Sequence, residues 1–142
     1  MRIHIATDHA GMELSAFLVT ELTKLGHELV DHGPKVYDAL DDYPGFCIAA
    51  AQAVVADQSA GVSALGIVLG GSGNGEQIAA NKVKGIRASL CFTENQARTT
   101  RQHNDSNMIC LSGDAVDPPV ALALTRIWLE SVFRHERKVL DA

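Results

Sequence analysis

The chain has 142 residues, of which 46% are hydrophobic and 20% are charged, and its formal net charge at pH 7 is −5. These values predict one globular domain, residues 1–142, and argue against a general nucleic-acid binder or a protein that coats anionic membranes. The first residues, MRIHIATDHAG, contain no signal-peptide stretch, and no apolar run reaches transmembrane length. The three cysteines form no CxxC pair and lie among apolar neighbours, which predicts reduced thiols in a cytoplasmic protein.

Short β-rich runs alternate regularly with helix-compatible stretches. The hydrophobic patterns predict five strands, at 3–7, 28–31, 65–69, 88–92 and 108–111. Each strand is followed by a predicted helix, at 12–25, 46–57, 75–83, 94–103 and 118–134 respectively. Residues 32–44 are predicted to form a surface loop. Strands joined by helices are typical of βαβ units, so we expect an α/β fold with a doubly wound parallel sheet of about five strands, covered by helices on both faces.

The most informative segment is IVLGGSGNGEQIAANK at residues 67–82, in which an apolar strand meets a glycine loop that opens a helix. Five of the six residues from Gly70 to Gly75 are Gly or Ser. Such a loop points backbone N–H groups and the positive end of a helix into one small volume, which favours an anion. Glu76 follows directly, and because a carboxylate is a poor anion ligand, we expect it to transfer protons.

Neither of two common nucleotide-binding motifs is present in this loop. Glu76 and Gln77 stand where a P-loop would have its Lys and its Ser or Thr, and the glycines are spaced G-x-G-x-G rather than G-x-G-x-x-G. A small anion or a transient oxyanion therefore fits the loop better than a large nucleotide. No group of His, Cys and Asp has zinc-ligand spacing, and aromatic residues make up only 5%, so we expect no metal, flavin or other cofactor.

Polar residues follow several of the predicted strands. Asp8 and His9 follow the first strand, Glu76 follows the third, and Asp114 follows the fifth. Ligands of open parallel sheets bind at the carboxyl ends of the strands, near a switch in strand order. We therefore expect these residues to form one site, whereas His103 at a helix end is not placed by this rule.

Five motifs occur in one order: DHAG at 8–11, DYP at 42–44, GGSGNGEQIAANK at 70–82, GIRA at 85–88 and RQHND at 101–105. With them the chain resembles the type B ribose-5-phosphate isomerase family (RpiB/LacAB sugar-phosphate isomerases), from the first strand to about residue 111. The resemblance implies a Rossmann-like or flavodoxin-like sandwich and a homodimer, or a tetramer of paired dimers, in which the partner subunit completes each site. It also implies a metal-independent aldose–ketose isomerisation of a sugar phosphate through a cis-enediolate, with ribose 5-phosphate and ribulose 5-phosphate as the default pair.

The resemblance also implies roles for single residues. Glu76 would be the base, because the Cys that many family members have at the position of Gly70 is missing here. His103 would assist ring opening with Asp8 as its acidic counterpart. The resemblance assigns the anion hole to Gly71, Ser72, Gly73, Asn74 and Gly75, and the sugar or phosphate pocket to His9, Tyr43 and Asn104. It also implies that Arg134, in the last helix, binds the phosphate in the other subunit's site. Lys138 lies where some relatives have an arginine.

Each of these residues also has a simpler structural interpretation. Asp8 is suited to cap the first helix, and Glu76 to complement the positive end of a helix. His103 is suited to a helix C-terminus, and Arg134 and Lys138 to a solvated helix end. Beside the glycine loop and IAANK, the base role is favoured for Glu76, whereas both roles stay open for Asp8.

Asp114 is the main departure from the family pattern. Most relatives carry a phosphate-binding arginine in the turn after the fifth strand, where this chain has Ser112-Gly113-Asp114. Two unit charges about 4 Å apart at an effective dielectric of about 20 interact by about 4 kcal/mol. Asp114 is therefore a candidate specificity residue, and two alternatives remain open: the same chemistry on a tetrose phosphate, a hexose phosphate or a free sugar, and a non-catalytic sugar-phosphate-binding module.

Overall fold

The computed structural model describes residues 1–34 and 43–134, without the side chain of Tyr43. Its helices and strands alternate along the chain as the sequence predicted. Their bounds are β1 Arg2–Thr7, a short 3-10 helix η1 His9–Gly11, α1 Met12–Lys24, β2 Glu28–Asp31, α2 Tyr43–Ser59, β3 Ala64–Gly70, α3 Asn74–Asn81, β4 Ala88–Leu90, α4 Glu94–Asn104, β5 Met108–Ser112 and α5 Pro118–Glu130.

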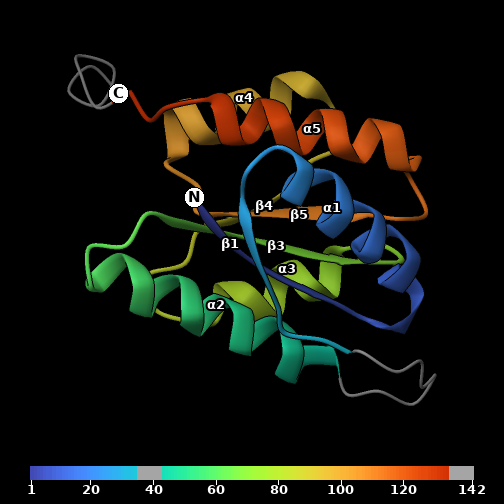
Figure 1. The fold of residues 1–142 in the computed structure, drawn as a ribbon, viewed down its shortest axis with the longest axis horizontal. Coiled ribbons are helices and arrows are strands. Elements are labelled where there is room, and N and C mark those ends of the chain that lie inside the picture. Colours follow the sequence, from blue (N-terminus) through green and yellow to red (C-terminus); the bar gives the residue numbers. More distant parts are fainter. Residues whose placement is uncertain (35–42, 135–142) are drawn as a thin grey trace.

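The five strands form one parallel sheet in the order β2-β1-β3-β5-β4. Helices α1, α4 and α5 cover one face and α2 and α3 the other (Figure 1). This arrangement confirms the predicted doubly wound α/β sandwich. The chain leaves β1 toward β2 on one side and returns to β3 on the other, so the switch in strand order lies between β1 and β3.

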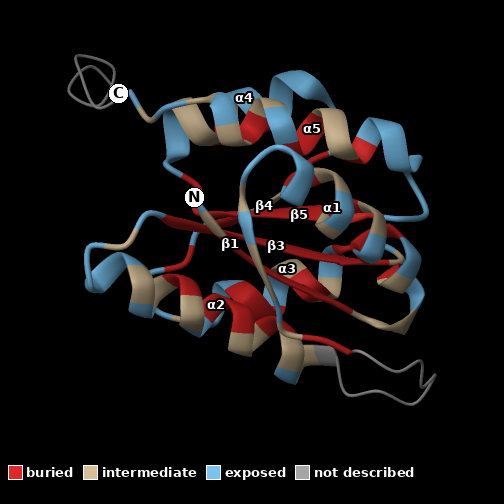
Figure 2. Cartoon of the chain, in the orientation of Figure 1, coloured by how far each residue is buried: buried red, intermediate tan, exposed pale blue. Residues whose placement is uncertain are grey.

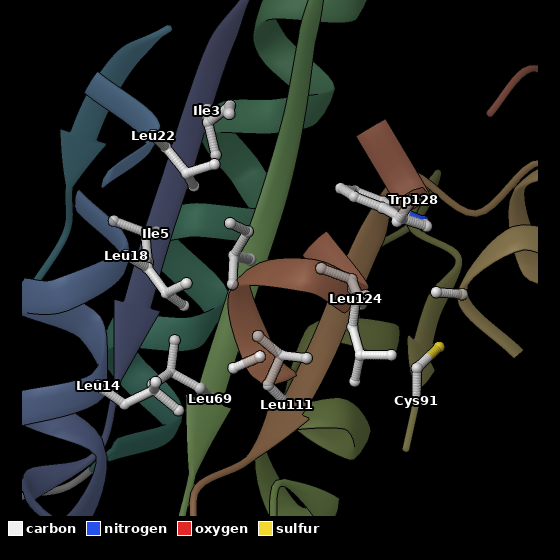
Figure 3. Packing of buried hydrophobic residues seen from close by; sticks show 14 of the residues in the cluster. Ile3, Ile5, Leu14, Leu18, Leu22, Leu69, Cys91, Leu111, Leu124 and Trp128 are labelled. Atoms are coloured by element: carbon white, nitrogen blue, oxygen red, sulfur yellow. The ribbon is translucent and has the colours of Figure 1, made fainter. Parts of the chain in front are cut away.

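The alternation of side chains along each strand divides the core into two layers. Ile3, Ile5 and Leu69 pack under α1 and α5, where Trp128 is fully buried (Figure 3). The intervening residues of the strands, such as Val68, pack against the small side chains of α2 and α3 on the other face. The strands β1, β3 and β5 are therefore buried along most of their length (Figure 2), as continuous apolar runs predict for a parallel sheet. The outer strand β2 has no buried residue.

The last helix is shorter than the sequence predicted. The apolar pattern predicts a helix to residue 134, but α5 ends at Glu130, and Ser131 is extended, with φ −89° and ψ 152°. The Ser131 hydroxyl donates to the Ile127 carbonyl oxygen at 2.7 Å, and the Arg134 N–H donates to the Gln102 carbonyl oxygen of α4 at 2.9 Å. Hydrogen bonding to α4 thus replaces the last helical turn, and Arg134 does not belong to a helix.

Two other predicted boundaries also shift. The predicted strand at 88–92 ends at Leu90, and the predicted surface loop at 32–44 gives way to α2 at Tyr43. Residues 35–42 of that loop lie outside the described part of the chain. Within the described ranges, no helix is both long enough and apolar enough to cross a membrane.

Candidate active site

The carboxyl ends of β1, β3 and β5 bring together residues that are far apart in the sequence. Asp8 follows β1, the glycine loop and Glu76 follow β3, and Asp114 follows β5. Because β3 pairs with both β1 and β5, these three strand ends are direct neighbours. The site therefore lies at the switch in strand order, where the sequence predicted it.

The glycine loop is held in place by the turn after β5. The Ser112 hydroxyl donates to the Gly71 carbonyl oxygen at 2.7 Å, and the Asp114 N–H donates to the same oxygen at 3.0 Å. The Gly113 N–H donates to the Gly70 carbonyl oxygen at 2.8 Å. These three contacts fix the loop, so its free N–H groups need little reorganisation to meet an anion.

Gly73 makes the turn from this loop into α3 possible. It precedes the helix with φ +80°, a left-handed conformation that favours glycine. A Cβ atom there would lie 2.8 Å from the Leu111 carbonyl oxygen. The Cys110 thiol donates to the Gly73 carbonyl oxygen at 2.7 Å, and the Ser72 hydroxyl accepts from the Asn74 N–H at 3.2 Å.

Glu76 turns its carboxyl group back over the end of β3. The residue is only 3% exposed. A Cβ atom on Gly70 would collide with the Glu76 carboxyl group and would lie 2.7 Å from Oδ2 of Asp8. The two carboxyl groups therefore converge on the bare backbone of Gly70, and a hydrogen bond joins their side chains.

This environment raises the pKa of Glu76 to about 7. Burial is the largest cause, and the hydrogen bond with Asp8 and the negative charge of Asp8 add to it. A carboxyl group with a pKa near the working pH can both accept and return a proton, which is what a general base of an isomerisation must do.

Asp8 has the structural role that was left open, and it also contacts Glu76. Its Oδ1 accepts a hydrogen bond from the Gly11 N–H at 2.9 Å and so caps η1 at the entry to α1. His9 lies in η1 and lines an open cavity of about 570 Å³ together with Ala10, Met12 and Glu13. Asp8 and His9 thus both lie at the predicted edge of the sheet.

Asp114 faces the glycine loop. Its Oδ2 lies 3.1 Å from the position that a Cβ atom on Gly71 would take, and the Ala10 methyl group lies 3.8 Å from the same position. The carboxylate is therefore beside the loop, although Asp114 is exposed to solvent. Asp114, the predicted specificity residue, therefore lies next to the predicted anion-binding loop.

Three other predicted residues lie near the amino ends of the strands, at the edge of the sheet opposite Glu76. His103 and Asn104 end α4, which leads into the start of β5, and Arg134 follows α5. In Figure 1 the end of α5 is on the same side of the molecule as the start of β1. One chain therefore does not bring these residues to Glu76. Tyr43 begins α2 with its side chain undescribed, and Lys138 lies outside the described residues.

Arg134 lines a cavity of its own at this opposite edge. The cavity has a volume of about 560 Å³ and opens between α4, α5 and the segment after α5. Arg98 and Gln102 of α4 also line it. An arginine pair in an open cavity is suited to an anion that another molecule presents.

The sequence reasoning missed the thiol beneath the carboxyl pair. Burial, together with the charges of Glu76 and Asp8, raises the pKa of Cys47 to about 12, so this thiol stays protonated. The apolar neighbours of Cys47 predicted burial, but no local signal could place it near Glu76. Among the described residues, no group of three or more His, Cys, Asp and Glu is placed to hold a metal ion.

The chain matches the family model described as Ribose/Galactose Isomerase over residues 3–141. It is 45% identical to ribose-5-phosphate isomerase B of Mycobacterium tuberculosis (strain ATCC 25618 / H37Rv), covering 98% of this chain and 86% of the relative. It is 37% identical to a probable ribose-5-phosphate isomerase B of Mycoplasma pneumoniae, covering 96% of this chain and 90% of the relative.

Solved structures of ribose-5-phosphate isomerases B are also similar to this chain. Ribose-5-phosphate isomerase B of Clostridium thermocellum superposes with a TM-score of 0.89 at 37% identity, covering 99% of this chain and 92% of that one. The Mycoplasma genitalium enzyme with bound ribulose-5-phosphate superposes with a TM-score of 0.87 at 35% identity and the same coverage. With this fold, sequence match and arrangement of strand ends, the chain belongs to the ribose/galactose isomerase family of enzymes.

Proposed function

We propose that this protein is a metal-independent, cofactor-independent aldose–ketose isomerase that interconverts ribose 5-phosphate and ribulose 5-phosphate. The names of its relatives and the ribulose-5-phosphate bound to the Mycoplasma genitalium enzyme support this substrate pair. The observation that carries the chemistry is the buried carboxyl group of Glu76, with its pKa raised to about 7, directly beside the glycine loop.

The proposed mechanism uses the buried carboxyl group of Glu76 and the glycine loop beside it. Glu76 takes the proton from C2 of the open-chain aldose, and the electron pair moves into the C1 carbonyl group to give a cis-enediolate. Backbone N–H groups between Gly71 and Gly75 stabilise the negative oxygen, aided by the positive end of α3. Protonated Glu76 then returns the proton to C1, while the proton of the C2 hydroxyl passes to the negative oxygen on C1, so that C2 becomes the ketone and C1 carries the hydroxyl group. Asp8 shares a hydrogen bond with Glu76 and is suited to exchange protons with the substrate oxygens.

We infer that two copies of the chain share each site. His103, Asn104 and Arg134 lie at the sheet edge opposite Glu76, so they can serve this chemistry only in the site of a second copy. In that site, His103 would protonate the ring oxygen during ring opening, and Arg134, with Lys138, would hold the phosphate. His9, Tyr43 and Asn104 would complete the sugar pocket. A single domain of residues 1–142 in a cytoplasmic homodimer, or in a tetramer built from it, is the assembly that we propose.

A metal-free isomerisation assay tests this proposal. Protein treated with a chelator is given ribose 5-phosphate, tetrose and hexose phosphates and free aldoses, with Glu76→Gln as the inactive control. Turnover of ribose 5-phosphate supports the proposal, and a preference for another sugar keeps the chemistry but changes the substrate. Absence of turnover with every sugar, together with tight sugar-phosphate binding, would favour the non-catalytic binding module instead.

A further inference from the structure

The carboxylate of Asp114 lies beside the loop that the proposed function uses to stabilise negative charge. Its own N–H donates to the Gly71 carbonyl oxygen at 3.0 Å, and the neighbouring Gly113 N–H donates to the Gly70 carbonyl oxygen at 2.8 Å. Its Oδ2 lies 3.1 Å from the Cβ position of Gly71. The backbone hydrogen bonds of Gly113 and Asp114 thus place the negative charge of Asp114 beside the glycine loop.

The described part of this sheet edge carries no lysine or arginine to offset that charge. In the stretches 8–15, 32–34, 43–46, 71–77, 91–97 and 113–121, which follow the strands or begin the helices, there is no lysine and no arginine. The carboxylates in these stretches are Asp8, Glu13, Glu76, Glu94, Asp114 and Asp117. Lys35, Arg137 and Lys138 lie outside the described residues.

We propose that Asp114 is a specificity-determining residue that weakens the binding of the substrate's phosphate group at this site and favours a hydroxyl-bearing part of the sugar beside the glycine loop. The inference rests on the isomerase function proposed above and concerns the substrate class of that same site. The physical basis is that one full negative charge offsets the roughly half unit of positive charge at the N-terminus of α3. The loop keeps its N–H groups for the enediolate oxygen, at hydrogen-bond distance, but loses its longer-range attraction for a dianion.

A carboxylate at this place also offers acceptors that an arginine does not. Sugar hydroxyl groups donate hydrogen bonds to carboxylate oxygens, and such charge-assisted bonds are stronger than neutral ones. Asp114 is solvent-exposed, so screening limits its effect on phosphate. Substitution of Asp114 should therefore change KM rather than kcat, because its side chain lies beside the loop and not at the proton that Glu76 moves.

The test compares Asp114→Asn and Asp114→Arg with the wild type and with Asp117→Asn. Asp117 precedes α5 on the same loop and makes no side-chain cap hydrogen bond, so its substitution removes the same charge a few residues away. Steady-state kinetics give KM and kcat for ribose 5-phosphate and for free ribose. Titration calorimetry with inorganic phosphate gives a binding constant that does not depend on turnover.

Asp114→Asn should lower KM for ribose 5-phosphate and tighten phosphate binding roughly tenfold, and Asp114→Arg should do so more strongly. KM for free ribose should not fall with Asp114→Asn, because the amide keeps one hydrogen-bond acceptor but loses the charge-assisted bond to a sugar hydroxyl. The inference is overturned if Asp114→Asn changes KM and phosphate affinity no more than Asp117→Asn does. If the wild type isomerises neither sugar, the proposed function fails, and the phosphate titration alone decides the role of Asp114.

Discussion

The carboxyl group of Glu76 occupies the space beside Gly70 where a side chain at residue 70 would begin. A Cβ atom there would collide with the carboxyl group of Glu76 and would lie 2.7 Å from Oδ2 of Asp8. A side chain at residue 70 and this position of Glu76 therefore exclude each other. The cysteine that the family resemblance implies at residue 70 could therefore not be combined with this position of Glu76, which agrees with the proposal that Glu76 is the base in this chain.

The first prediction follows from this exclusion. Gly70→Ala should displace the carboxyl group of Glu76 and reduce kcat about a hundredfold, because a shift of about 1 Å in a catalytic group has effects of that size. Circular dichroism should show that the variant still folds. The matched control is Gly45→Ala, since a Cβ atom at Gly45 meets no atom within 4 Å. Full activity of Gly70→Ala would contradict the arrangement described for Glu76.

The second prediction concerns the base. Glu76→Gln keeps the size and buried position of the side chain but cannot accept the proton, so kcat should fall by about 10²- to 10⁴-fold. Binding of ribulose 5-phosphate, measured by titration calorimetry, should change only slightly. Glu13→Gln removes another carboxylate at the same edge and should leave kcat unchanged. A loss of binding that parallels the loss of turnover would show that Glu76 holds substrate and does not act as the base.

The third prediction is a pH profile. Because Glu76 must be ionised to act as a base, kcat/KM should rise with pH through an apparent pKa of about 7 that belongs to the Asp8–Glu76 pair. Asp8→Asn removes the negative charge that raises this pKa, so the rise should move to lower pH. An acid limb that stays in place in Asp8→Asn would show that Asp8 does not influence Glu76.

The fourth prediction links the same group to stability. The pKa of Glu76 is raised on folding from 4.5 to about 7, so the folded state favours the protonated form. The stabilisation this provides is fully present below pH 4.5 and is lost as the pH rises through 7. Glu76→Gln is always neutral, so its melting temperature should gain on that of the wild type between pH 5 and pH 8. A constant difference over this range would contradict the raised pKa.

The fifth prediction tests the shared site. Glu76→Gln and His103→Ala should each be inactive as pure proteins, because every site then lacks one of the two groups. After unfolding and refolding together, about half of the dimers should be mixed, and one of the two sites in each should be intact, which restores about a quarter of wild-type activity. Activity no higher than the sum of the separate variants would contradict a site built from two copies.

Much of this protein could be predicted from local patterns. Apolar runs followed by amphipathic stretches predicted the parallel sheet and its flanking helices, because hydrophobic periodicity reflects which face of each element is buried. The glycine loop followed at once by Glu76 predicted an anion-stabilising turn with a base, since only glycines permit such a tight approach of backbone groups. The motifs around this loop were sufficient to recognise the family.

Other features depended on contacts between distant parts of the chain. The pattern of α5 continues to residue 134, but hydrogen bonding of Arg134 to Gln102 ends the helix at Glu130. The raised pKa of Glu76 requires its burial and the proximity of Asp8. The two residues are 68 positions apart in the sequence. Only the order of the strands places Asp114 beside Gly71 and places His103 at the opposite edge. Local sequence thus determined which elements and groups exist, and the tertiary structure decided which groups meet, because burial and charge depend on neighbours that no short segment contains.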